Sequence, residues 1–118
     1  METKQAVDKL GALAQETRLG IFRLLVEAGD AGMNATAIAD SLQLAPATLS
    51  FHVAQLVRAG LVQSRQESRF IFYSVNYGAM DELIAYLVQD CCQGSACLPK
   101  TSAVETSAKR RRLAKSNP

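Results

Sequence analysis

The cysteines carry the most distinctive chemistry in this sequence. Cys91, Cys92 and Cys97 are the only three among 118 residues, and they lie within seven positions of one another. Thiolates select soft metals and metalloids, whereas a structural zinc site takes four ligands, usually cysteine or histidine. Three thiolates without a neighbouring histidine suit the pyramidal coordination of trivalent arsenic or antimony better than they suit zinc. The spacing therefore predicts a metalloid site.

Two other interpretations of these thiols stay open. Adjacent Cα atoms lie about 3.8 Å apart and ordinary disulfides span about 4.4–6.8 Å, so a bridge between Cys91 and Cys92 is disfavoured. A bridge from Cys97 to either of them is feasible, which keeps oxidation sensing as the alternative. The other interpretation is that the three thiols have no chemical role. Their tight clustering argues against it, because inert cysteines tend to be buried singly.

A second group of residues has the types needed to read DNA. Residues 46–58 predict a helix with an apolar stripe that faces a core. A helix that enters the major groove needs small or hydrogen-bonding groups on its opposite face. We predict DNA contacts from the side chains on that face and its flanks, namely Ala47, Thr48, Ser50, Phe51, His52 and Gln55.

Several of these contacts have alternatives. Phe51 either meets a thymine methyl or packs on a neighbouring helix. His52 either contacts a phosphate or is a structural histidine, and Arg58, at the helix end, contacts a phosphate or pairs with another helix. Arg65 and Arg69 bracket a predicted hairpin turn, where they would contact the DNA backbone or minor groove. For both arginines the alternative is an ordinary solvated charge.

Hydrophobic spacing predicts the elements that must position these residues. Spacings of three and four predict helices, and alternation predicts strands. The predicted inward sides include Leu19 in the second helix and Val57 in the fourth. The predicted helices lie around 7–14, over 16–28, from Asn34 or Thr36 through 40, over 46–58 and over 78–90, with strands at 62–65 and 70–75 around a turn at 66–68.

This order of elements describes a winged helix-turn-helix, a mainly α fold with a small β-hairpin. The first and last helices carry apolar stripes beyond what a small core needs, which predicts a homodimer through these two helices. We expect residues 1–92 to form the DNA-binding and dimerisation domain. Residues 93–118, rich in Gly, Ser, Thr and basic side chains, predict a flexible basic tail that includes Cys97.

Charge is divided unevenly between these parts. The formal charge is +2, yet residues 1–90 hold seven Lys/Arg against ten Asp/Glu, and residues 91–118 hold six against one. The argument for DNA therefore rests on local pattern and not on overall basicity. No apolar run is long enough to span a bilayer and no signal-peptide segment begins the chain, so we expect a cytoplasmic protein without a membrane partner. One histidine and the lack of a glycine-rich phosphate loop argue against an enzyme.

Four short motifs together resemble the ArsR/SmtB family of winged-helix repressors. They are Leu-Ala-Gln-Glu-Thr-Arg-Leu-Gly-Ile-Phe-Arg-Leu-Leu at 13–25, Thr-Leu-Ser-Phe-His-Val at 48–53, Ala-Gly-Leu-Val at 59–62 and Tyr-Ser-Val at 73–75. The likeness covers about residues 5–90, and the turn at 66–68 departs from it by lacking a glycine. It implies a homodimer that binds an inverted-repeat operator in double-stranded DNA and leaves when an inducer binds.

The resemblance also bears on where the inducer binds. Arsenic-sensing members often carry Cys-x-Cys at the start of the third helix, where this chain has Asn34 and Thr36. Zinc and cadmium sensors use Asp and His ligands on the last helix, where this chain has no histidine. A C-terminal arrangement like that of Cys91, Cys92 and Cys97 occurs in arsenic-responsive members.

The resulting hypothesis is a metalloid-responsive transcriptional repressor that needs no cofactor to bind DNA. Its inducer would be As(III), Sb(III) or an organoarsenical, bound by the three cysteines. A thiol-redox-sensing repressor of the same fold and a constitutive DNA-binding module are the alternatives.

Overall fold

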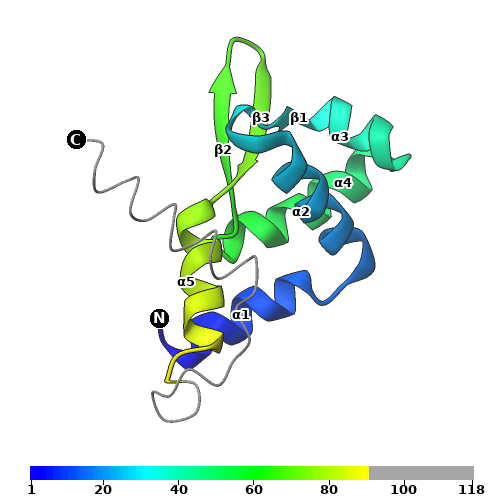
Figure 1. The fold of residues 1–118 in the computed structure, drawn as a ribbon. Helices are drawn as coiled ribbons and strands as arrows, with labels where there is room; N and C mark the ends of the chain where they lie inside the picture. The colour runs from blue at the N-terminus through cyan, green and yellow to red at the C-terminus, as the bar shows by residue number, and fades with distance from the viewer. Residues whose placement is uncertain (91–118) are drawn as a thin grey trace, which may run out of the picture.

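The computed structural model describes residues 1–90. The predictions for Cys91, Cys92, Cys97 and the basic tail lie outside these described residues. Within them the elements follow the order helix, helix, helix, helix, hairpin, helix, with one additional short strand (Figure 1). They are α1 (Thr3–Leu13), α2 (Glu16–Ala28), the 3-10 turn η1 (Gly29–Ala31), β1 (Met33–Asn34), α3 (Ala35–Leu42), α4 (Pro46–Arg58), β2 (Val62–Glu67), β3 (Phe70–Val75) and α5 (Tyr77–Leu87).

Local signals in the sequence set the helix ends. The Asn34 side chain caps α3 by accepting a hydrogen bond of 2.8 Å from the Ala37 amide, which confirms one of the two predicted caps. Pro46 stands at the first position of α4, where its missing N–H costs nothing. Other helix ends were misplaced. α1 begins at Thr3 instead of about 7, α3 continues to Leu42 instead of 40, and α5 ends at Leu87 instead of 90.

The core lies where α2, α3 and α4 meet the inner face of the sheet. Its fully buried side chains are Ile21, Leu25, Ile38, Val53, Leu56, Leu61 and Val75. Two side chains predicted to point inward do not, because Leu19 is 46% exposed and Val57 is 38% exposed. Each lies at the edge of its helix's apolar stripe.

The sheet has three strands in the order β1-β3-β2, all antiparallel, so the predicted hairpin is only part of it. β1 pairs Met33 with Tyr73, and its two residues are too few to show an alternating pattern. β2 runs through Glu67, beyond the predicted 62–65, which leaves Ser68 and Arg69 as the turn instead of 66–68. Ser68 adopts a φ of 59°, so the tight turn forms without glycine.

The remaining helices, α1 and α5, lie together at the end of the molecule opposite the projecting hairpin (Figure 1). The Thr3 and Tyr86 hydroxyls share a hydrogen bond of 2.5 Å that joins them. Val7, Leu10 and Leu87 on these helices are 58%, 42% and 56% exposed. The monomer therefore leaves apolar side chains uncovered on this pair of helices. Within the described residues, no helix has the length and apolar character to cross a membrane.

Candidate nucleic-acid interface

α4 presents its predicted reading face to solvent. α3 ends at Leu42, the left-handed φ of 54° at Gln43 then turns the chain, and Pro46 starts α4. Leu49, Val53 and Leu56 anchor α4 in the core. Of the predicted contact residues, the ones at the start of the helix are exposed, namely Ala47, Thr48, Ser50 and Phe51. The helix thus meets the geometric requirement for insertion into a major groove.

His52 is held by a partner from another helix. Its Nδ1 lies 3.3 Å from Nη1 of Arg18 on α2, and Arg18 Nε donates to the Ala12 carbonyl at 2.7 Å. Because an arginine can only donate, Nδ1 is the acceptor of this hydrogen bond. This contact supports the structural interpretation of His52. The sequence offered no signal for it, since the two residues are 34 positions apart.

The ring of Phe51 contacts the next residue of its own helix. Its side chain is 58% exposed, and its ring meets the His52 ring edge-on at 5.2 Å between centroids and an interplanar angle of 71°. Such edge-to-face pairs stabilise by about 0.5–1.5 kcal/mol. The contact of Phe51 with a thymine methyl stays a prediction.

Gln55 does not belong to the exposed group at the start of α4. It is half-buried and lines a hollow of about 280 Å³ between α1 and α4, together with Asp8, Arg58 and Ala59. Its Oε1 accepts a hydrogen bond of 3.4 Å from Nη1 of Arg58, so Arg58 pairs within its own helix. The side of α4 that carries Gln55 faces α1, whereas Thr48 and Phe51 lie nearer the helix start.

The two arginines of the hairpin occupy different positions. Arg65 lies within β2, where its guanidinium donates to the Ala31 carbonyl at 2.7 Å and to Glu67 Oε1 at 2.8 Å, and covers the Phe72 ring at 5.1 Å. These contacts tie the hairpin to the η1 turn. Arg69 lies in the exposed turn, the position expected for a DNA-contacting wing residue.

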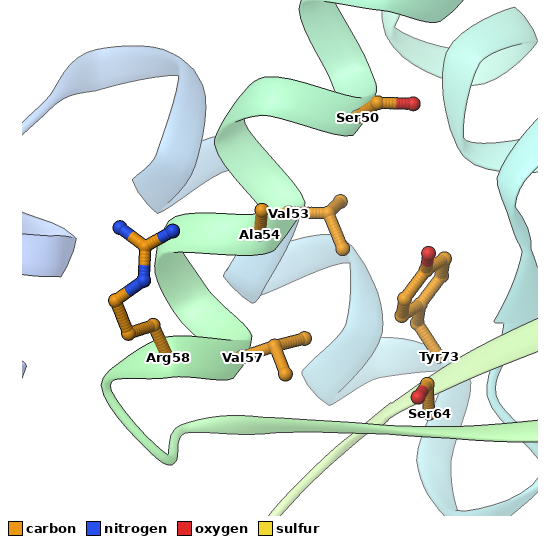
Figure 2. Close-up of a pocket in the computed structure, with 7 residues that line it drawn as sticks. All are labelled: Ser50, Val53, Ala54, Val57, Arg58, Ser64 and Tyr73. Atoms are coloured by element: carbon orange, nitrogen blue, oxygen red, sulfur yellow. The ribbon is translucent and has the colours of Figure 1, made fainter.

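A second hollow separates α4 from the hairpin. It has a volume of about 360 Å³ and is lined by Ser50, Val53, Ala54, Val57, Arg58, Ser64 and Tyr73. Figure 2 shows Val53 and Val57 pointing from α4 toward the Tyr73 ring, while Arg58 extends away from it. Ser64 pairs directly with Tyr73 across β2 and β3. The hollow explains why Val57 is not buried, because the strands do not close over this side of the helix.

No metal-binding group of three or more His, Cys, Asp or Glu side chains exists within residues 1–90. Asn34, at one of the two third-helix positions where arsenic sensors often carry cysteine, is occupied in capping α3. The predicted ligands follow Asp90 in the sequence, so their arrangement lies beyond the described part of the chain.

The fold and the exposed face of α4 define a winged helix-turn-helix DNA-binding protein. A family model described as a helix-turn-helix domain matches residues 13–65. The chain is 33% identical over 91 residues to the transcriptional activator HlyU of Vibrio cholerae. This match covers 77% of this chain and 82% of HlyU. The chain belongs to the family of helix-turn-helix transcriptional regulators that includes HlyU. Its relatives are regulators and not enzymes.

Solved structures show the same fold. HlyU from Vibrio cholerae N16961 has a TM-score of 0.61 at 34% identity, over 79% of this chain and all (100%) of that one. The reduced form of HlyU has a TM-score of 0.59 at 32% identity, over 77% of this chain and 93% of that one. A third structure is a homodimeric winged helix-turn-helix domain from Mycobacterium bovis, described as a possible ArsR-family regulator. It has a TM-score of 0.61 at 22% identity, over 81% of this chain and 89% of that one.

Proposed function

We propose that this regulator is a metalloid-responsive repressor. Two copies bind an inverted-repeat operator through α4 and the hairpin, and As(III) or Sb(III) bound by Cys91, Cys92 and Cys97 releases them. The observation that carries the proposal is the set of three thiols, without histidine, that follows α5 in the sequence. Soft thiolates are the ligands such a centre requires.

The exposed apolar side chains of α1 and α5 support the dimer. Val7, Leu10 and Leu87 are each more than two-fifths exposed on adjacent helices, and a second copy would remove them from water. A two-fold axis there pairs the same surface with itself, as in most homodimers. The Mycobacterium bovis domain with this fold is a homodimer.

Metalloid binding can reach the DNA-binding helices through α5. Arsenous acid and three thiols form three As–S bonds and release three waters. The ring so closed would constrain the chain just after α5, which is bonded to α1 through Tyr86 and Thr3. α1 in turn connects to α2 and, through Ala12, Arg18 and His52, to α4. An inducer acts by binding one arrangement of these helices more tightly than the other.

The test uses the full chain and a duplex that it enriches from a random DNA pool, with binding followed by fluorescence anisotropy. Arsenite and antimonite should release the duplex, and Zn(II) should not. Cys91→Ser, Cys92→Ser and Cys97→Ser should each bind DNA and lose the arsenite response. Ser95→Ala, between the cysteines, is the matched control that should keep it. Release of all three cysteine variants by arsenite would contradict the proposal.

Thiol oxidation is the second candidate, favoured by the relative whose structure is that of reduced HlyU. Cys97 and either Cys91 or Cys92 would form a disulfide while peroxide takes up two electrons and two protons and leaves as two waters. In the same assay, peroxide would then release the duplex, dithiothreitol would restore binding, and arsenite would have no effect. Because HlyU is an activator, a reporter gene behind the enriched duplex determines the direction of regulation.

A further inference from the structure

The reading helix lacks the side chains that recognise G·C pairs. From Pro46 to Val57, α4 contains no arginine, lysine, aspartate or glutamate, and its one charged residue is Arg58 at the end. Guanine is most often read by a bidentate arginine or lysine, and cytosine by a carboxylate that accepts from its amino group. Thr48 and Ser50 carry hydroxyls that bond to any base. Before Arg58, the exposed face of α4 therefore has no group selective for G·C.

The same face offers apolar groups instead. Ala47 and Phe51 are exposed near the start of α4, the part of a recognition helix that contacts base edges. The only apolar group that the major groove presents is the C5-methyl of thymine. A phenyl ring that is 58% exposed in the free protein gains by covering such a methyl.

A chain of contacts also links the Phe51 ring to α2 and α1. The His52 ring meets it edge-on, Arg18 holds His52 at 3.3 Å, and the Ala12 carbonyl holds Arg18 at 2.7 Å. These contacts keep the ring directed outward before DNA arrives. A preorganised side chain loses less conformational entropy on binding than a free one.

We infer that Phe51 determines operator specificity by contacting a thymine methyl, so that each half-site presents A·T pairs to the start of α4. His52 and Arg18 are positioning residues for that ring. The inference rests on the proposed operator binding, and it concerns which bases are read, independently of what the cysteines bind.

The experiment compares the duplex enriched by the full chain with the same sequence synthesised with uracil, which lacks only the thymine methyls. Loss of one methyl contact should raise Kd about fourfold, and loss of one contact in each of two half-sites should raise it about fifteenfold. Phe51→Ala should bind the thymine and uracil duplexes equally. Phe51→Leu, which keeps an apolar side chain, should retain part of the difference. Phe70→Ala, which removes another half-exposed phenyl from the hairpin, should retain all of it.

The outcomes separate this inference from the proposed function. Enrichment of half-sites with G·C pairs at the centre, or equal binding of both duplexes by the unmodified chain, would overturn the role of Phe51 and leave operator binding intact. A uracil penalty that persists in Phe51→Ala would assign the methyl contact to another residue and also overturn it. Failure to enrich any duplex would refute operator binding and the inference with it.

Discussion

Gly32 is the position where a single added methyl group should do the most damage to the wing. Its φ is +72°, and a Cβ built there would lie 2.3 Å from the Tyr73 carbonyl oxygen on β3. Gly29 provides a matched comparison, because its φ is +76° and a Cβ there meets nothing within 4 Å. The ψ angles also agree, at −166° and −158°.

The two substitutions therefore share one cost and differ in another. Alanine in this glycine-only backbone region costs about 1–3 kcal/mol at either site. At Gly32 the methyl must also push β1 away from β3, a steric misfit of the kind that costs about 1–3 kcal/mol more. We expect Gly32→Ala to lower the free energy of unfolding by about 2 kcal/mol more than Gly29→Ala does. That difference is a large part of the roughly 5–15 kcal/mol that stabilises a typical domain.

Urea unfolding followed by circular dichroism measures both variants, at one protein concentration because the stability of the proposed dimer would depend on it. With a typical slope of about 1–3 kcal/mol per molar urea, the midpoint of Gly32→Ala should lie about 1 M below that of Gly29→Ala. DNA affinity should fall in Gly32→Ala, since this contact fixes the base of the hairpin. Equal loss of stability in the two variants would refute the close approach of Gly32 to β3.

Three further predictions concern the helices and the tail. Asn34→Ala should lose about 1 kcal/mol in urea unfolding because the α3 cap is removed, whereas Asn34→Asp should not; equal loss would exclude capping. Val7→Glu should shift the proposed dimer toward monomer in sedimentation equilibrium, whereas Leu19→Glu, at an exposed position of α2, should not. An unchanged mass for Val7→Glu would rule out this interface. Deleting 103–118 should weaken DNA binding most at low salt and keep the arsenite response, and loss of that response would relocate the switch to the tail.

Much of the fold follows from signals within a few residues of each helix end. Gly29 ends α2, Asn34 caps α3 and Pro46 begins α4, and each was readable because capping and turn chemistry involve neighbours in sequence. Strand β1 was not readable, since two residues show no period and its partner Tyr73 lies far along the chain. The prediction that Leu19 points inward was wrong, because the apolar stripe of a helix does not show how much of that stripe the neighbouring elements cover.

The candidate interface divides in the same way. Sequence alone determined that α4 carries hydroxyl, small and aromatic groups and no charge before Arg58, because residue types need no coordinates. It also determined that three thiols follow the last helix. Only the tertiary structure decided that Arg18 holds His52 and that Arg65 is bound to the Ala31 carbonyl, each across 34 positions. Such pairs depend on which surfaces meet when helices and strands pack, and that depends on the whole chain.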